Sequence, residues 1–134
     1  MRFCILVTGI ALSAVGAERV KVSDFGWNPE DATEIVQRAL DSGARQVVFD
    51  RREGPWVTRS VFARSDTEIV FEEGAELVAR RGEFRAVRDA LLSVVCATNV
   101  TVRGLGRGAT LRMWKADYLK PPYKRAEWRH ALNV

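Results

Sequence analysis

Cysteine and proline are both scarce in this chain of 134 residues, which contains two cysteines and four prolines. Cys4 lies inside an apolar run at the N-terminus, so cleavage of that run would leave Cys96 as the only cysteine. A single cysteine excludes an intramolecular disulfide in the cleaved chain. Because a lone cysteine in a strand-like stretch is most often a small buried side chain, we predict that Cys96 points into the core.

Long hydrophobic runs are also missing. The N-terminal run Phe3–Val15 is almost entirely apolar or small, but it is too short to span a bilayer comfortably. It follows Met1-Arg2 and ends in the small residues Val15-Gly16-Ala17, which is the order typical of a cleaved secretory signal. The sequence therefore predicts a signal peptide over residues 1–17 and a mature chain over 18–134. We expect a secreted or periplasmic protein with no membrane span after cleavage.

No block of like charge occurs in the chain. Its 21 basic residues are spread among 17 acidic ones, giving a net charge of +4. This distribution is typical of a solvated surface of mixed sign, and we expect no nucleic-acid partner. The spacing Gly104-x-Gly106-x-Gly108 resembles a dinucleotide-binding loop, but that motif requires a following helix. Ala109–Met113 instead continues in a strand pattern, so the glycines are interpreted as turn residues.

The stretch Ala90–Met113 contains three short apolar runs in which inward and outward residues alternate, as in half-buried strands. The connections between the runs are too short to contain a helix. The alternation predicts that Thr101, Arg103 and Arg112 lie outside. The residues predicted to point inward are Leu92, Val94, Cys96, Val100, Val102 and Leu111.

One segment has convincing helical spacing. The apolar residues at 35, 36, 39 and 40 form a stripe, and Gly43 is placed to end the helix. Asp31 and Glu34 have the spacing of a capping box at its start. Residues 84–89 could form a helical turn or an excursion loop. The other segments predicted as strands are Arg19–Val22, Gln46–Asp50, Trp56–Thr58, Ser60–Phe62, Thr67–Phe71 and Ala75–Ala79.

Two internal similarities indicate a repeat. Glu73–Leu77 resembles Arg107–Leu111 at an offset of 34 (111 − 77), and Leu92–Val94 resembles Leu132–Val134 at an offset of 40 (134 − 94). Repeats of about 20 to 50 residues are typical of solenoids. A solenoid that stops on an unpaired repeat would expose a half-built core, so we interpret the chain as the N-terminal part of a longer protein.

The sequence resembles the pectin-lyase-like superfamily of right-handed parallel β-helices. The resemblance covers nearly all of residues 20–113. It is carried by segments similar to the family's entry strand and capping helix, its first full turn and its recurring turn motif: Val22–Gly26, Asp31–Thr33, Ala39–Gly43, Ser65–Ala75 and Asn99–Gly106. The predicted fold class is therefore an all-β solenoid, a right-handed parallel β-helix with an N-terminal capping α-helix, truncated after the first coils. The resemblance also implies that substrate lies in a groove along one parallel sheet.

The family's catalytic motifs do not accompany this resemblance. Polygalacturonase-type members use Asn-x-Asp, Asp-Asp and Gly-His-Gly in later coils, and none of these occurs in this chain. The lyases use acidic calcium ligands with an Arg or Lys base, again in middle coils. We therefore assign no catalytic residue, no metal ligand and no cofactor to this segment, and enzymatic activity stays an open question. Calcium is implied only for the full-length protein.

The irregular segment Trp114–His130 is the candidate binding region. Aromatic faces and basic donors suit a sugar ring that bears a carboxylate or sulfate. The alternative is that this loop packs its aromatic residues back over the strands. Glu127 and His130 together provide fewer ligands than a zinc site needs. The candidate substrate-binding residues are Trp114, Tyr118, Lys120, Trp128, Arg129 and His130.

These observations favour the N-terminal part of an exported polysaccharide-active β-helix protein. Its partner would be a polysaccharide, in particular an acidic one, and its activity that of a polysaccharide lyase or a glycoside hydrolase. The segment alone is expected to be inactive. The alternative function is a non-catalytic carbohydrate-binding or adhesin-type surface protein. An independent α/β domain is disfavoured because only one helix is convincing.

Overall fold

The computed structural model describes residues 17–123 and 129–134, so residues 1–16 of the predicted signal peptide lie outside its described part. None of the helices in these ranges is both long and apolar enough to cross a membrane. The helical elements are η1 (Val22–Phe25), α1 (Thr33–Leu40) and η2 (Asp117–Leu119). The strands are β1 (Arg19–Lys21), β2 (Gln46–Phe49), β3 (Trp56–Thr58), β4 (Val61–Phe62), β5 (Thr67–Phe71), β6 (Glu76–Ala79), β7 (Ala90–Ser93), β8 (Val100–Gly104), β9 (Thr110–Arg112) and β10 (His130–Asn133).

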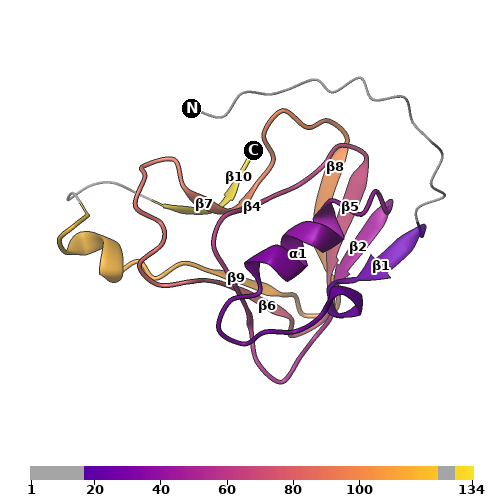
Figure 1. The fold of residues 1–134 in the computed structure, drawn as a ribbon, viewed down its shortest axis with the longest axis horizontal. Coiled ribbons are helices and arrows are strands. Elements are labelled where there is room, and N and C mark those ends of the chain that lie inside the picture. The colour runs from indigo at the N-terminus through magenta and orange to yellow at the C-terminus, as the bar shows by residue number, and fades with distance from the viewer. Residues whose placement is uncertain (1–16, 124–128) are drawn as a thin grey trace.

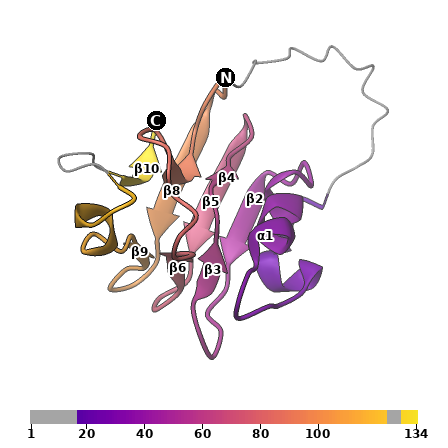
Figure 2. The same cartoon turned by 60° about the vertical axis from the view of Figure 1, so that its left-hand side comes forward.

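The strands form three parallel sheets that the chain visits in a fixed order (Figure 1). The sheet orders are β1-β2-β5-β8, β3-β6-β9 and β4-β7-β10. Each round of the chain therefore contributes one strand to each sheet: β2–β4, then β5–β7, then β8–β10. Figure 2 shows the successive rounds stacked beside one another, with α1 at one end and β8 and β10 toward the other. The expectation of parallel strands with a single α-helix is confirmed.

The strand register confirms both internal repeats. Leu77 pairs with Leu111 in the β6–β9 ladder, which is the offset of 34 found in the sequence. Leu92 pairs with Leu132 in the β7–β10 ladder, at the offset of 40. The two similarities thus identify residues that occupy equivalent positions in successive rounds.

The core lies between the three sheets. Val47 and Ile69 are fully buried register partners, and Phe49 stacks on its partner Phe71 with ring centroids 4.4 Å apart. Val102 continues this row in β8 but is only partly buried. Complete burial of each such side chain contributes roughly 1.5–3 kcal/mol, so the first two rounds contribute more than the third.

Helix α1 seals the first round by bonding to its strand edges. The backbone N–H of Ala32 donates to Val57 O of β3 at 2.7 Å. The Gln37 side chain donates to Phe62 O of β4 at 3.0 Å and accepts from Phe62 N at 2.9 Å, much as a neighbouring strand would. In the remaining sheet, β1 pairs with β2. Each sheet is therefore covered at this end.

The capping box predicted for α1 is wrong. Asp31 Oδ1 accepts a hydrogen bond from Thr33 N at 3.0 Å, but the N-cap residue is Ala32. The Glu34 carboxylate contacts Arg59 instead of returning to the helix start, because the β3–β4 turn places a guanidinium beside it. Gly43 follows the helix with φ +80°, a left-handed conformation that glycine adopts without steric cost.

The inward position predicted for Cys96 is also wrong. β7 ends at Ser93, and the chain then turns outward, leaving Cys96 exposed with φ +53°. In the full, uncleaved chain Cys96 is disulfide-bonded, and its partner lies outside the described residues. The absence of an intramolecular disulfide concerns the cleaved chain and stays a prediction. The other inward predictions are confirmed: Leu92 is buried, and Val94, Val100, Val102 and Leu111 pack partly buried against the core. Thr101, Arg103 and Arg112 are exposed, as predicted.

Candidate functional site

The segment between β9 and β10 leaves the sheets and folds back on them. Trp114 donates its indole N–H to Ala79 O at 2.6 Å, at the end of β6. The Arg81 guanidinium lies over the Trp114 ring, 4.1 Å from its centroid, and forms an ion pair with Asp117 at 3.4 Å. These contacts fix η2 against the preceding round of the chain, and they cover one face of the indole.

Arg129 holds the returning end of this segment. Its Nε donates to Phe84 O at 3.1 Å and its Nη2 to Arg85 O at 2.7 Å, and the residue is only 6% exposed. The guanidinium also lies 5.7 Å from the Tyr118 ring and 5.1 Å from the Tyr123 ring. Burial raises the pKa of the Tyr118 hydroxyl. The cation thus joins the loop of residues 80–89, which forms neither helix nor strand, to the segment after β9.

The structure brings some of the candidate binding residues together and separates others. Trp114, Tyr118 and Arg129 form a packed cluster whose polar groups are largely directed at the protein itself. Lys120 and His130 are exposed, and His130 begins β10 beside Ala90. Trp128 lies outside the described residues. Among the candidate binding residues that the structure describes, the accessible donors are therefore Lys120 and His130, while Trp114 and Tyr118 mainly anchor the segment.

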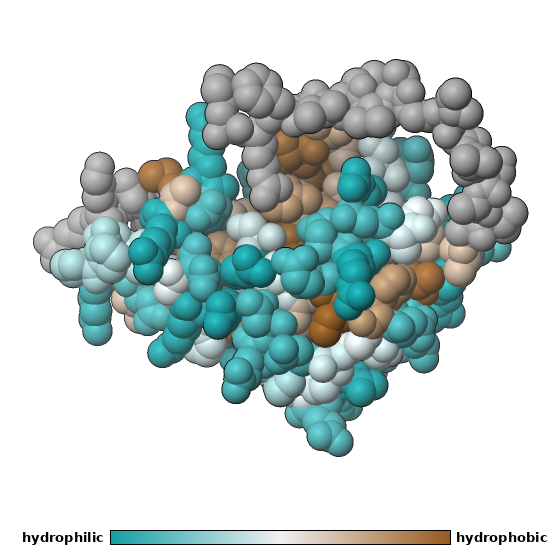
Figure 3. Space-filling view, in the orientation of Figure 1, coloured by the Kyte–Doolittle hydropathy of each residue, from teal (hydrophilic) through white to brown (hydrophobic). Residues whose placement is uncertain are grey.

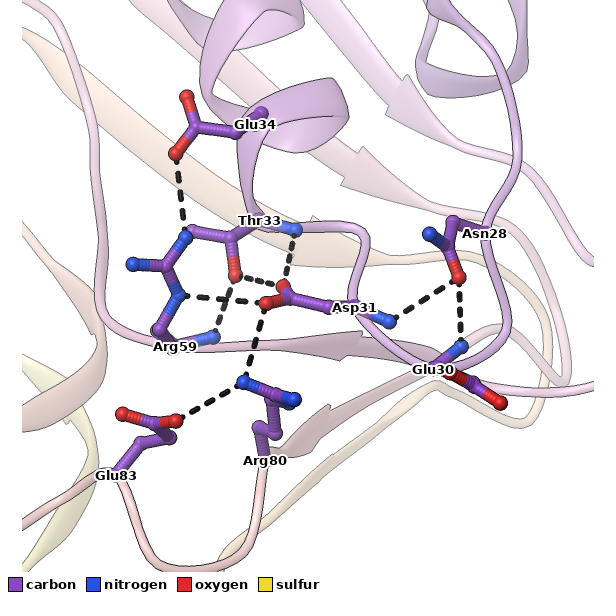
Figure 4. Close-up of polar contacts among 8 residues, drawn as sticks. All are labelled: Asn28, Glu30, Asp31, Thr33, Glu34, Arg59, Arg80 and Glu83. Atoms are coloured by element: carbon purple, nitrogen blue, oxygen red, sulfur yellow. Dashed lines mark hydrogen bonds and ion pairs between the residues drawn. The ribbon is translucent and has the colours of Figure 1, made fainter.

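A second polar cluster surrounds Asp31 at the start of α1 (Figure 4). Asp31 Oδ1 accepts hydrogen bonds from the backbone and hydroxyl of Thr33, and Oδ2 lies 3.4 Å from both Arg59 Nε and Arg80 Nη1. Partial burial would raise the pKa of this carboxyl, but the Thr33 hydrogen bonds and the two guanidinium charges outweigh it and lower the pKa. Glu34 and Glu83 contact the outer sides of the same two arginines. The cluster joins the helix to the first and second rounds, which is a structural role.

A hollow of about 400 Å³ opens at the start of the strands in the β1-β2-β5-β8 sheet. Arg19, Gln46 and Glu68 are consecutive register partners and therefore form one row across β1, β2 and β5. Glu18 and Arg45, which precede the first two members of that row, complete the lining. Figure 1 places this end of β1 on the opposite side of the molecule from η2.

The carboxylate of Glu68 is already engaged on both oxygens. Gln46 Nε2 donates to Oε2 at 2.6 Å, and Arg103 Nε forms a short contact with Oε1. These two partners lower the pKa of Glu68, so the group stays ionised and its charge is compensated by Arg103. The guanidinium groups of Arg19 and Arg45, in contrast, have no hydrogen bond or ion pair with any residue in the described ranges.

Sequence reasoning missed the hollow because its residues come from separate strands. A signal was present, since each of these strands begins with a polar or charged residue just before its apolar run. Aligning the strand starts would have placed Arg19, Gln46 and Glu68 in one row. That alignment requires knowing which residues pair between β1, β2 and β5. The two repeats indicate pairing only in the other two sheets, between β6 and β9 and between β7 and β10.

The remaining surface contains no other obvious centre. Hydrophilic residues cover most of the face seen in Figure 3, and apolar residues show there only as scattered small areas. Among the described residues there is no cluster of three or more His, Cys, Asp or Glu side chains that could hold a metal ion. No protein-family model, no curated protein and no solved structure matches this chain.

Proposed function

We propose that this chain forms the cap and first coils of an exported, right-handed parallel β-helix protein that binds acidic polysaccharide. The observation that carries the proposal is the fixed order in which the chain visits three parallel sheets, with α1 sealing the first round. The right hand follows from general chain sterics, because crossover connections between parallel strands are right-handed in about 98% of known cases. Stacked coils offer long, regular surfaces suited to extended polymers.

Two features support an acidic polymer as the ligand. The first is the net charge of +4, and the second is the set of exposed cations near both candidate regions: Lys120 in one, Arg19 and Arg45 in the other. Guanidinium groups bind carboxylates and sulfates through paired hydrogen bonds. The test is affinity electrophoresis of the full chain through gels that contain polygalacturonate, alginate, a sulfated galactan or a neutral glucan. Retardation by an acidic polymer is expected, and equal mobility in all four gels would overturn the proposal.

The enzymatic form of the proposal is a polysaccharide lyase or a glycoside hydrolase. Its acid–base residues would lie in further coils stacked on β8, β9 and β10, because the catalytic motifs of the superfamily that the sequence resembles are missing from this sequence. The non-catalytic form is a carbohydrate-binding or adhesin-type surface protein, which needs no such residues. Assays for new reducing ends and for unsaturated uronate products distinguish them. The chain alone is expected to bind without cleaving.

Export is proposed on the order of residues at the N-terminus, where Met1-Arg2 precedes the apolar run and Ala17 precedes Glu18. Cleavage after Ala17 would release a chain that begins at Glu18. N-terminal sequencing of the protein recovered from the medium or periplasm of an expressing bacterium tests this. A product that retains Met1 would contradict it.

A further inference from the structure

The hollow at the start of β1, β2 and β5 has the size and donor set of a small-ligand site. Its volume of about 400 Å³ falls within the range of roughly 300–1,000 Å³ that is usual for such sites. The described lining residues are two arginines, two glutamates and a glutamine, whose aliphatic stems add apolar surface beside the polar groups. A ligand that fits this lining must therefore combine polar groups with some apolar surface.

The charge available to a ligand in the hollow is positive. Arg103 compensates the charge of Glu68, so the described lining keeps two positive charges, on Arg19 and Arg45, against the one carboxylate of Glu18. Several other arginines of the described ranges form ion pairs, including Arg59, Arg64 and Arg80. The two guanidinium groups of the hollow contact no described partner. They can bind an anion without giving up an existing interaction.

The other lining groups are hydrogen-bond acceptors suited to hydroxyl groups. Gln46 uses its amide N–H₂ on Glu68, which leaves its carbonyl oxygen directed to other donors. Glu18 and Glu68 add carboxylate oxygens. A small inorganic anion would use the two guanidinium groups but none of these acceptors, whereas a sugar ring with one carboxylate would use both kinds of group.

We propose that this hollow is a subsite for a uronate unit, in which Arg19 and Arg45 bind the carboxylate and Gln46, Glu18 and Glu68 accept hydrogen bonds from ring hydroxyls. This assignment rests on the proposed polysaccharide-binding function and specifies where and through which group the polymer is recognised. Both guanidinium groups are solvent-exposed, and an ion pair exposed to water contributes little to affinity. Removal of both arginine charges should therefore weaken binding roughly 2- to 30-fold.

The experiment is a titration of the full, isotope-labelled chain with trigalacturonate, followed through its backbone amide NMR signals. The expected result is a shift of the signals of Arg19, Gln46 and Glu68. The double variant Arg19→Gln/Arg45→Gln should bind roughly 2- to 30-fold more weakly. The matched control is Arg88→Gln/Arg107→Gln, which removes the same charge from two exposed arginines outside the hollow and should bind like the unmodified chain.

Three outcomes would overturn the subsite. One is unchanged affinity of the Arg19→Gln/Arg45→Gln variant, and another is equal weakening in both double variants, which would indicate non-specific attraction. The third is equally tight binding of inorganic sulfate with the same signal shifts, which would indicate a simple anion site. The subsite would be wrong and the proposed function right if polygalacturonate retarded all variants in the gels and trigalacturonate shifted the NMR signals of Trp114 or His130 instead of those of the hollow. Absence of retardation of the unmodified chain in every gel would instead refute the function itself.

Discussion

Thr58 is fully buried in β3, and its hydroxyl has no hydrogen-bond partner in the described part of the chain. Burial of an unpaired hydroxyl costs about 1–3 kcal/mol relative to its exposure to water. Thr58→Val replaces that hydroxyl with a methyl group of similar size. We expect the variant to raise the free energy of unfolding by about 0.5–1 kcal/mol in urea titrations.

The control for this prediction is Thr58→Ser, which keeps the hydroxyl and removes the methyl group. It should lower the free energy of unfolding by about 1 kcal/mol because it leaves a small void. If Thr58→Val were as destabilising as Thr58→Ser, the hydroxyl would have to donate to a buried acceptor.

Asp31 makes stability dependent on pH because its folded-state pKa is lowered. A carboxyl with a lowered folded pKa contributes its full stabilisation above the unfolded value, about pH 4, and loses it as the pH falls through the folded value. Asp31→Asn should cost about 1–2 kcal/mol at pH 7, since Thr33, Arg59 and Arg80 all lose an ionised acceptor. Urea titrations of both proteins at pH 7, 5, 4 and 3 measure the difference.

The difference between the two proteins should stay constant from pH 7 to 5 and shrink below pH 4, because only the unmodified chain then protonates residue 31. Other carboxylates are common to both proteins and cancel. A difference that stays unchanged at pH 3 would show that the cluster stabilises the fold without the charge of Asp31.

At this scale the sequence predicted side-chain direction in the half-buried strands and less well elsewhere. Alternation placed Leu92 inside and Arg112 outside because a strand has a fixed period of two residues. The half-buried character predicted for β7 is wrong, because Leu91 and Ser93 are buried as well as Leu92. The same alternation extended to Cys96 was wrong, because the strand ends at Ser93 and the backbone turns. Glu34 had capping-box spacing, but Arg59, distant in sequence, offered an ionic partner that a local pattern does not include.

Among the elements, the segment after β9 depends most on a single residue. Arg129 is buried and donates to the carbonyl groups of Phe84 and Arg85. Arg129→Ala should cost about 2–3 kcal/mol, because two carbonyl groups lose a charged donor and two tyrosine rings lose a packing partner. Arg129→Lys should recover less than half of this loss, since an ammonium group lacks the planar fork that reaches both carbonyls.

Thermal unfolding followed by far-UV circular dichroism measures these effects. Arg88→Ala is the control, because this exposed side chain makes no described contact and should change stability by less than about 0.5 kcal/mol. Full recovery by Arg129→Lys would show that charge alone, without the geometry of the guanidinium, holds the segment.

The elements themselves were largely predictable. The strands Trp56–Thr58 and Thr67–Phe71 have the predicted bounds, and the two repeats identified the register partners of β6–β9 and β7–β10. The hollow and the Arg129 cluster were not predictable in this way. Both are assembled from segments in different rounds, and their composition depends on register and loop path, which no local periodicity encodes.

Considered as a whole, the molecule has one sealed end and one open end. β1, Ala32 and Gln37 cover the edges of the first round, whereas the outer edges of β8, β9 and β10 have no partner within residues 17–123 and 129–134. Inward residues at that open end are incompletely buried, and Leu132 is 40% exposed. Unpaired strand edges with apolar residues behind them are templates for further strands.

The open end should therefore make this chain associate with itself as its concentration rises, since a second copy is the available source of strand edges. Sedimentation equilibrium of the full chain should show an average mass that increases with concentration. Leu132→Lys should keep the chain monomeric. A second copy stacked on β10 would bury the lysine ammonium group, which would have no acidic partner there. Thr101→Lys, on the exposed outer side of β8, adds the same charge without blocking the apolar face and should associate like the unmodified chain. An average mass equal to that of the monomer at all concentrations would show that this end does not accept strands, and so would equal association of the two lysine variants. If only Leu132→Lys loses association, the contact between copies lies at the outer edges of β8, β9 and β10.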